Sequence, residues 1–170
     1  PVVYTVNYPL AYFAERIAGE IVDIYFPEMD GDPAFWNPSP EEIVEYQNAD
    51  LILLNGAGYA KWVPKVSLPP ARLVDTSAIV RDRYIPLKGA ETHAHGPGGA
   101  HAHGDMAFTL WPDPQLAIRQ AAAIRDAFTR RWGDHAAEFE SGFRALEKDL
   151  LSLDAALEMG FAALGKQPLI

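Results

Sequence analysis

Four of the five histidines lie within one short stretch of the chain, and their spacing suggests metal coordination. His93 and His95 form one His-x-His pair, and His101 and His103 form a second pair after a Gly-Pro-Gly-Gly-Ala turn. In an extended segment, residues i and i+2 point to the same side, so each pair can direct two imidazoles at one point. The glycines of the turn allow the segment to fold back, so the two pairs can meet.

Neutral imidazole is the commonest zinc ligand and also suits copper and nickel. Glu91 precedes the first pair and Asp105 follows the second, so the stretch also offers oxygen donors. The predicted metal site therefore consists of His93, His95, His101, His103 and Asp105. Zn²⁺ is the expected metal because nitrogen donors outnumber oxygen donors, with Cu²⁺ and Mn²⁺ as alternatives.

A His-rich tract has a second interpretation, which the sequence leaves open. Such a tract can be an irregular loop with weak and unspecific metal affinity, or an auxiliary arm beside a site elsewhere. His135 stands apart, in the first turn of a predicted helix. We interpret it as a surface or interlobe residue, because a helix N-terminus disfavours the charged imidazole.

The composition limits the classes of protein. With 170 residues, 49% hydrophobic, the chain is long enough for one domain with a sizeable core. Its net charge of -9 argues against nucleic acid as a partner, since phosphate binding needs a basic face. Because cysteine is absent, thiolate zinc sites, disulfides and cysteine nucleophiles are excluded. No apolar run approaches the roughly 18 residues of a membrane span.

Hydrophobic periodicity predicts an α/β fold. Strands are expected over 2–7, 21–26, 49–55 and 72–76, and helices over 10–18, 39–48 and 113–133. Ser39 with Glu42 reads as a capping box, and Asp113 as a helix cap. The order strand, helix, strand indicates parallel pairing, so we expect a four-stranded parallel sheet flanked by helices.

A long helix is expected from Asp134 onward. Its apolar residues are spaced three or four apart along one stripe: Phe139, Phe143, Leu146, Leu150, Leu153, Leu157, Phe161 and Leu164. A helix of about 45 Å outreaches a four-stranded sheet, so it must brace a further domain or pair with a second chain. We accordingly divide the chain into an α/β lobe (1–133), a long helix (134–165) and the start of a further lobe (166–170).

The loops contain two further sets of candidate residues. Residues 27–38 follow the second strand, and their Phe35 and Trp36 are expected to plug the core from above. Asp30, Asp32 and Asp75 are expected near strand ends, where carboxylates more often cap helices or contact solvent. The chain has no P-loop, dinucleotide fingerprint, serine elbow or zinc-protease helix, so we do not expect an enzyme.

Several motifs in order resemble a known family. They are Asp32-Pro33 followed by Trp36, Ala49-Asp50-Leu51 leading to Asn55-Gly56, Trp62, the His-rich stretch, Trp111-Pro-Asp-Pro114 and the long helix. The chain resembles the metal-binding solute-binding proteins of bacterial zinc and manganese ABC transporters, the TroA-like class. The resemblance covers the first lobe and the backbone helix of that two-lobed fold.

The resemblance implies a periplasmic or extracytoplasmic receptor, with its signal peptide removed, that delivers a divalent metal to a membrane permease. It also places two histidine ligands at positions 34 and 109, where this chain has Ala34 and Thr109. Alanine cannot coordinate, and a neutral threonine hydroxyl is a poor zinc ligand. Either the His-rich stretch has taken over coordination, or a pocket near Ala34, Phe35, Trp36 and Thr109 holds something apolar or nothing. The alternative function is an assembly module that dimerises through its long helix, with the His-rich stretch incidental.

Overall fold

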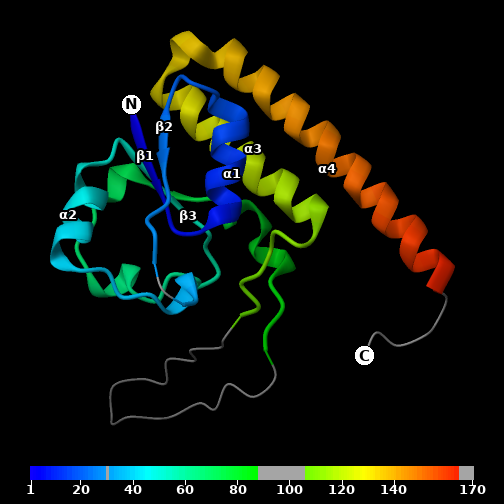
Figure 1. Ribbon diagram of the computed structural model, residues 1–170, viewed down its shortest axis with the longest axis horizontal. Coiled ribbons are helices and arrows are strands. Elements are labelled where there is room, and N and C mark those ends of the chain that lie inside the picture. Colours follow the sequence, from blue (N-terminus) through cyan, green and yellow to red (C-terminus); the bar gives the residue numbers. More distant parts are fainter. Residues whose placement is uncertain (30, 88–105, 165–170) are drawn as a thin grey trace.

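A computed structural model describes residues 1–29, 31–87 and 106–164 (Figure 1). Its centre is one parallel sheet in the order β2-β1-β3-β4. The strands are β1 (Val2–Thr5), β2 (Asp23–Tyr25), β3 (Leu51–Leu54) and β4 (Leu73–Asp75). The predicted four-stranded parallel sheet is therefore confirmed, although each strand is shorter than expected. The residues beyond the strand ends leave the ladder; Asn7, for example, caps the following helix.

Helices cover both faces of the sheet. They are α1 (Tyr8–Ala18), α2 (Pro40–Asn48), α3 (Pro114–Arg131) and α4 (Ala136–Leu164). Figure 1 shows α1, α3 and α4 together on one side and α2 on the other, which is the arrangement expected of right-handed crossovers. No helix within the described ranges is long and apolar enough to cross a membrane.

The predicted helix starts are confirmed at two of three positions. Ser39 and Glu42 form the capping box, and Asp113 Oδ1 accepts from the amides of Gln115 and Leu116 at 2.9 and 3.3 Å. The expectation for Asp134 is wrong. It lies inside a 3₁₀ turn (Gly133–His135) that reverses the chain after Trp132, and α4 begins only at Ala136. A short 3₁₀ turn, Val63–Lys65, lies between β3 and β4.

The aromatic loop after β2 fulfils its prediction only in part. Trp36 packs against the core, with its ring 5.9 Å from that of Trp62 and 6.4 Å from that of Tyr46. Phe35, in contrast, is 61% exposed. Asp32 caps a 3₁₀ turn (Pro33–Phe35) by accepting from the Ala34 amide at 2.9 Å. That turn points Ala34 inward and leaves Phe35 facing solvent.

Helix α4 has two halves with different surroundings. Phe139, Phe143 and Leu146 are buried against the lobe. Further along the same stripe, Leu153 is 49% and Phe161 is 52% exposed. The first half therefore completes the core of the lobe, whereas most side chains of the second half from Leu151 onward are exposed. Residues 166–170, which we assigned to a further lobe, lie outside the described residues.

Candidate functional site

The carboxyl ends of three strands carry a buried polar network. Asn7 follows β1, Asn55 follows β3 and Thr76 follows β4, and all three are buried. Asn7 Nδ2 donates to Asn55 Oδ1 at 3.3 Å, and Thr76 Oγ1 donates to the Leu54 carbonyl at 2.9 Å. In open α/β sheets ligands bind at this edge. The network therefore lies where we expect a binding site.

Helix α3 joins the same network through Gln120. Its Nε2 lies 3.0 Å from Thr76 Oγ1 and 3.3 Å from Asn55 Oδ1, whereas its Oε1 has no hydrogen-bond partner among the described residues. Four segments distant in sequence are thereby joined at one place. Buried amides need such partners, because an unpaired polar group in the interior costs about 1–3 kcal/mol.

The segment that precedes α3 contacts this polar network. Asn55 Nδ2 donates to the Phe108 carbonyl at 2.9 Å. The ring of Tyr59 makes edge contacts with those of Phe108 and Trp111, at 5.2 and 5.6 Å between centroids. Burial, and next the charge of Asp32, raise the pKa of Tyr59 to about 12. Tyr59 therefore stays a neutral phenol at physiological pH and lies between the Asp32 loop and the Phe108 segment.

The two positions that the resemblance singled out lie on segments that meet at the same turn. The amide of Lys61 donates to the Ala34 carbonyl at 3.1 Å, and Lys61 Nζ lies 5.9 Å from the centroid of Phe108, next to Thr109. Ala34 is fully buried, while Thr109 is exposed. The structure thus brings the two segments together, although neither position carries a metal ligand.

The predicted ligands His93, His95, His101, His103 and Asp105, and also Glu91, lie outside the described residues. The structure does describe both flanks of this stretch. Pro86 and Met106 form an antiparallel bridge, and the Ala107 amide donates to the Ile85 carbonyl at 2.9 Å. The flanks therefore meet directly before the Phe108–Thr109 segment.

The remaining candidates behave as structural residues. His135 is a surface residue whose Nδ1 lies 3.6 Å from a Glu138 carboxylate oxygen. Asp32 caps its turn, and Asp75 forms an ion pair with Arg81 at 3.1 Å. Asp30 lies outside the described residues. In the described ranges, no group of three or more His, Asp or Glu residues could hold a metal ion.

Sequence reasoning missed a second polar cluster after β4. Ser77 Oγ and Tyr84 Oη lie 2.5 Å apart, and Ser77 Oγ lies 3.2 Å from Asp75 Oδ1. The bond between Ser77 and Tyr84 closes the 3₁₀ turn η4 (Ala78–Arg83), which leads into the bridge at Pro86. The available signal was the run of Asp, Thr and Ser at the end of a predicted strand.

A small hollow of about 170 Å³ lies beside this edge, at the end of β3. Its lining is mainly apolar and consists of Leu54, Asn55, Gly56, Gly58, Tyr59, Ala60, Val63 and Pro64.

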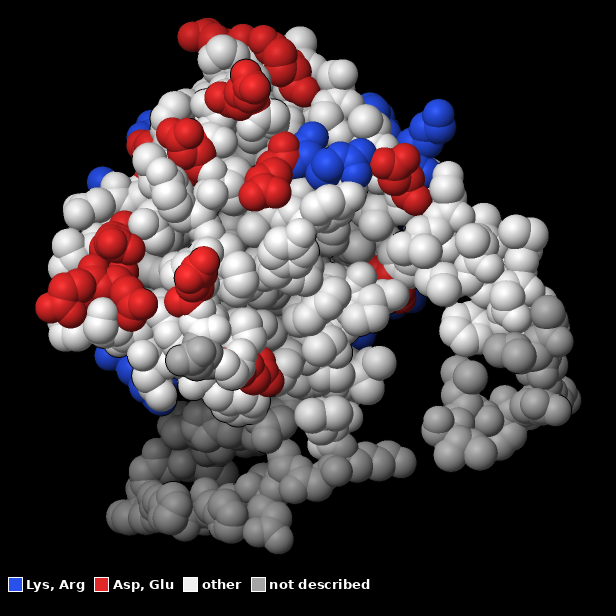
Figure 2. Space-filling model, viewed as in Figure 1, with Lys and Arg blue, Asp and Glu red and all other residues white. Residues whose placement is uncertain are grey.

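Acidic side chains gather elsewhere: Figure 2 shows a red cluster where α2 lies in Figure 1, and that helix carries Glu41, Glu42 and Glu45. The cluster is therefore separate from the polar network.

Solved structures share this architecture. The Bacillus subtilis metal-dependent lipoprotein YcdH superposes with a TM-score of 0.73 at 22% identity, over 91% of this chain and 53% of that one. The zinc-bound ZnuA-like domain of Streptococcus pneumoniae AdcA gives 0.69 at 24% identity, with the same coverage. The described part of this chain therefore shares its fold with about half of each of these two structures.

Residues 3–170 match the family model "Zinc-uptake complex component A periplasmic", and the chain belongs to this family. The zinc-binding lipoprotein AdcA of S. pneumoniae is 27% identical over 94% of this chain and 32% of its own length. The iron-binding protein YfeA of Yersinia pestis is 29% identical over 85% of this chain and 43% of its own. The chain thus spans about a third to two fifths of these relatives. The resemblance to metal-binding solute-binding proteins of the TroA-like class, which we inferred from the sequence, is confirmed.

Proposed function

We propose that this chain is the metal-binding lobe of a receptor for a divalent metal, zinc foremost, which it delivers to the membrane permease of an ABC transporter. Family membership supports the class of function. Relatives are named as binders of zinc and of iron, so the class of ligand is a divalent metal and not zinc alone. The family description supports a periplasmic or extracytoplasmic location.

We infer that the His-rich stretch supplies the ligands that positions 34 and 109 lack. The observation that carries this inference is the bridge between Pro86 and Met106. It sets both flanks of the stretch beside Phe108 and Thr109, and this segment contacts the same turn as Ala34. Four imidazoles and the carboxylate of Asp105 are a donor set that suits zinc, which favours tetrahedral nitrogen and oxygen coordination.

The first test removes these ligands. Replacing His93, His95, His101 and His103 together by Ala should abolish most zinc binding in calorimetry near neutral pH. His135→Ala is the matched control, because it removes the remaining histidine from a surface position. Zinc affinity of the unaltered chain should also fall below about pH 6.5, where protons compete for imidazole. Unchanged affinity in the fourfold variant would contradict the proposal.

The second test restores the family ligands in the background without loop histidines. Ala34→His together with Thr109→His should create a zinc site, because the two segments meet at Lys61. Since Ala34 is fully buried, circular dichroism must show that the variant folds, and Thr109→His alone, at an exposed position, serves as the comparison. No gain in zinc affinity by a folded double variant would show that the two positions cannot share a metal.

A second candidate function is assembly through α4. It is favoured by the apolar side chains that the far half of this helix exposes, among them Leu153 and Phe161. In that case two copies of the chain would pair along the stripe, and metal binding by the His-rich stretch would be incidental. Metal binding without self-association would favour the receptor, and self-association without metal binding would favour the assembly module.

A further inference from the structure

The segment that leads into the His-rich stretch is anchored at a buried serine. Ser77 follows β4 and is fully buried. Its Oγ lies 2.5 Å from Tyr84 Oη and 3.2 Å from Asp75 Oδ1. A carboxylate only accepts, so both contacts are satisfied when Ser77 donates to Asp75 and Tyr84 donates to Ser77. The phenol of Tyr84 therefore ties this preceding flank, residues 84–87, to the end of β4.

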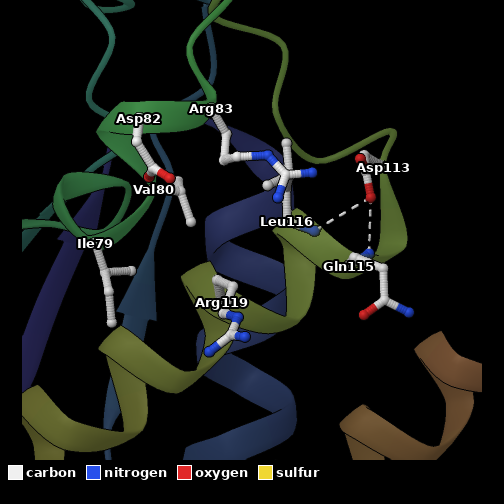
Figure 3. A pocket seen from close by; sticks show the side chains of 8 residues that line it. All are labelled: Ile79, Val80, Asp82, Arg83, Asp113, Gln115, Leu116 and Arg119. Atoms are coloured by element: carbon white, nitrogen blue, oxygen red, sulfur yellow. Dashed lines mark hydrogen bonds between the residues drawn. The ribbon is translucent and has the colours of Figure 1, made fainter.

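Packing alone does not hold the preceding flank in place. Val80 is buried in the middle of η4. Beyond it, a hollow of about 430 Å³ separates Asp82 and Arg83 from the start of α3 (Figure 3). Ile85, which follows Tyr84, is 66% exposed. The end of η4 thus lacks close-packed neighbours on this side, and the hydrogen bond of Tyr84 fixes its position.

The flank that follows the stretch, residues 106–108, is anchored beside the same serine. Asn55 Nδ2 donates to the Phe108 carbonyl at 2.9 Å. The next residue, Gly56, lies so close to Ser77 that a Cβ added to it would overlap Ser77 Oγ. The anchors of the two flanks are therefore neighbours, at the adjoining ends of β3 and β4.

A ring of contacts closes the base of the His-rich stretch. It runs through three pairs: Ser77 with Tyr84, Ile85 with Ala107, and Phe108 with Asn55. Bringing two His-x-His pairs to one metal ion costs conformational entropy, and this cost is smaller when both ends of the stretch are already held together. The ring can therefore act on metal affinity without supplying a ligand.

We propose that Tyr84 and Ser77 are positioning residues for metal binding by the His-rich stretch. This inference rests on the proposed function. The hydrogen bond between the two side chains keeps the preceding flank beside the following flank before a metal ion arrives. Neither side chain is a proposed ligand, so removal of this hydrogen bond lowers metal affinity and leaves the donor set unchanged.

Tyr84→Phe removes only the phenol oxygen and tests the proposal in the whole chain. Zinc affinity in calorimetry near neutral pH should fall roughly threefold to tenfold, the factor that one hydrogen bond of ordinary strength provides. Tyr12→Phe is the matched control, because it removes a phenol oxygen that contacts Arg16 on α1. It should leave zinc affinity unchanged. Equal affinities of Tyr84→Phe and the unaltered chain would overturn the proposal.

Hydrogen exchange separates positioning from a general loss of stability. In Tyr84→Phe the Ala107 amide should exchange faster, because its bond to the Ile85 carbonyl lies next to the lost contact. The Asp50 amide, which donates to the Val2 carbonyl at 2.8 Å, should keep its protection. Faster exchange at both amides would show that the variant loosens the whole fold, which contradicts a positioning role.

A double variant tests whether the two residues act through one contact. Tyr84→Phe with Ser77→Ala should lower zinc affinity by less than the two single losses combined, whereas additive losses would count against the proposal. The variant without the four loop histidines separates this inference from the proposed function. If it binds zinc as before, both fail. If it loses zinc while Tyr84→Phe binds normally, only the positioning role fails.

Discussion

The side chain of Asn55 makes hydrogen bonds to three different segments of the chain. Its Oδ1 accepts from Asn7 and Gln120, and its Nδ2 donates to the Phe108 carbonyl. At the residue scale, the carboxyl edge therefore depends on one buried amide that serves as donor and acceptor at once. The positions at which the resemblance implies histidine ligands hold Ala34 and Thr109, and Asn55 fixes the Phe108 carbonyl next to Thr109.

Asn55→Ala should destabilise the fold by about 2–4 kcal/mol, because it leaves several buried groups without partners. Urea unfolding measures this loss. Asn48→Ala, at an exposed position at the end of α2, is the control and should change the free energy of unfolding by less than about 0.5 kcal/mol. Similar values for the two variants would mean that water replaces the lost bonds without cost.

Single residues differ in how far the sequence predicts them. Ser39, Glu42 and Asp113 act within a few residues of their own position, so local pattern is sufficient. Phe35 was assigned wrongly because aromatic character suggests burial, while the turn capped by Asp32 directs its side chain outward. Asn7, Phe108 and Gln120, to which the Asn55 side chain is bonded, are 48 and more residues away, and sequence spacing carries no information on such pairings.

At the scale of elements, α1 and α4 cross with their backbones close together. A methyl group added at Gly142 would lie 2.5 Å from the Ile17 carbonyl oxygen and 2.7 Å from that of Arg16. On the same helix, a methyl at Gly160 would meet nothing within 4 Å. Gly142 is therefore required by the contact between helices. Sequence periodicity predicted both helices but could not show where they touch.

Two glycine substitutions on α4 should consequently have opposite effects. Gly142→Ala should destabilise the fold by about 1–3 kcal/mol, because the helices must move apart. Gly160→Ala should favour the folded state by up to about 1 kcal/mol, since alanine is the better helix former. Thermal or urea unfolding of both variants measures the difference. If both were stabilising, α1 would adapt to the added methyl group without loss of packing.

At the scale of the whole molecule, the first half of α4 packs against the lobe and the second half exposes apolar side chains to solvent. Its residues from Asp149 to Leu164 include three acids, Asp149, Asp154 and Glu158, and no Lys or Arg. The chain spans 53–58% of the solved structures YcdH, the ZnuA-like domain of AdcA and ZnuA. The sequence predicted this long stripe correctly, but its period alone could not show which part of it the lobe buries.

We expect the 170-residue chain to self-associate through this surface, as a two-fold pair of α4 helices. Each roughly 100 Å² of apolar surface removed from water contributes about 2.5 kcal/mol, against an association cost of about 4–15 kcal/mol. A contact of several hundred Å² is thus needed, and the exposed half of α4 offers Leu151, Leu153, Met159 and Phe161 for it. Added salt should strengthen the pairing, because it screens repulsion between the Asp154 and Glu158 carboxylates of the two chains, whereas Asp149 is paired with Arg16.

Sedimentation at micromolar concentration measures this equilibrium. Leu157→Glu with Phe161→Glu should give a monomer, because it adds charge to the contact at positions that the lobe does not cover. Val44→Glu, an exposed apolar position on α2, is the matched control and should leave association unchanged. If the unaltered chain sediments as a monomer at all salt concentrations, the exposed half of α4 does not drive assembly. The proposed receptor function does not depend on this assembly.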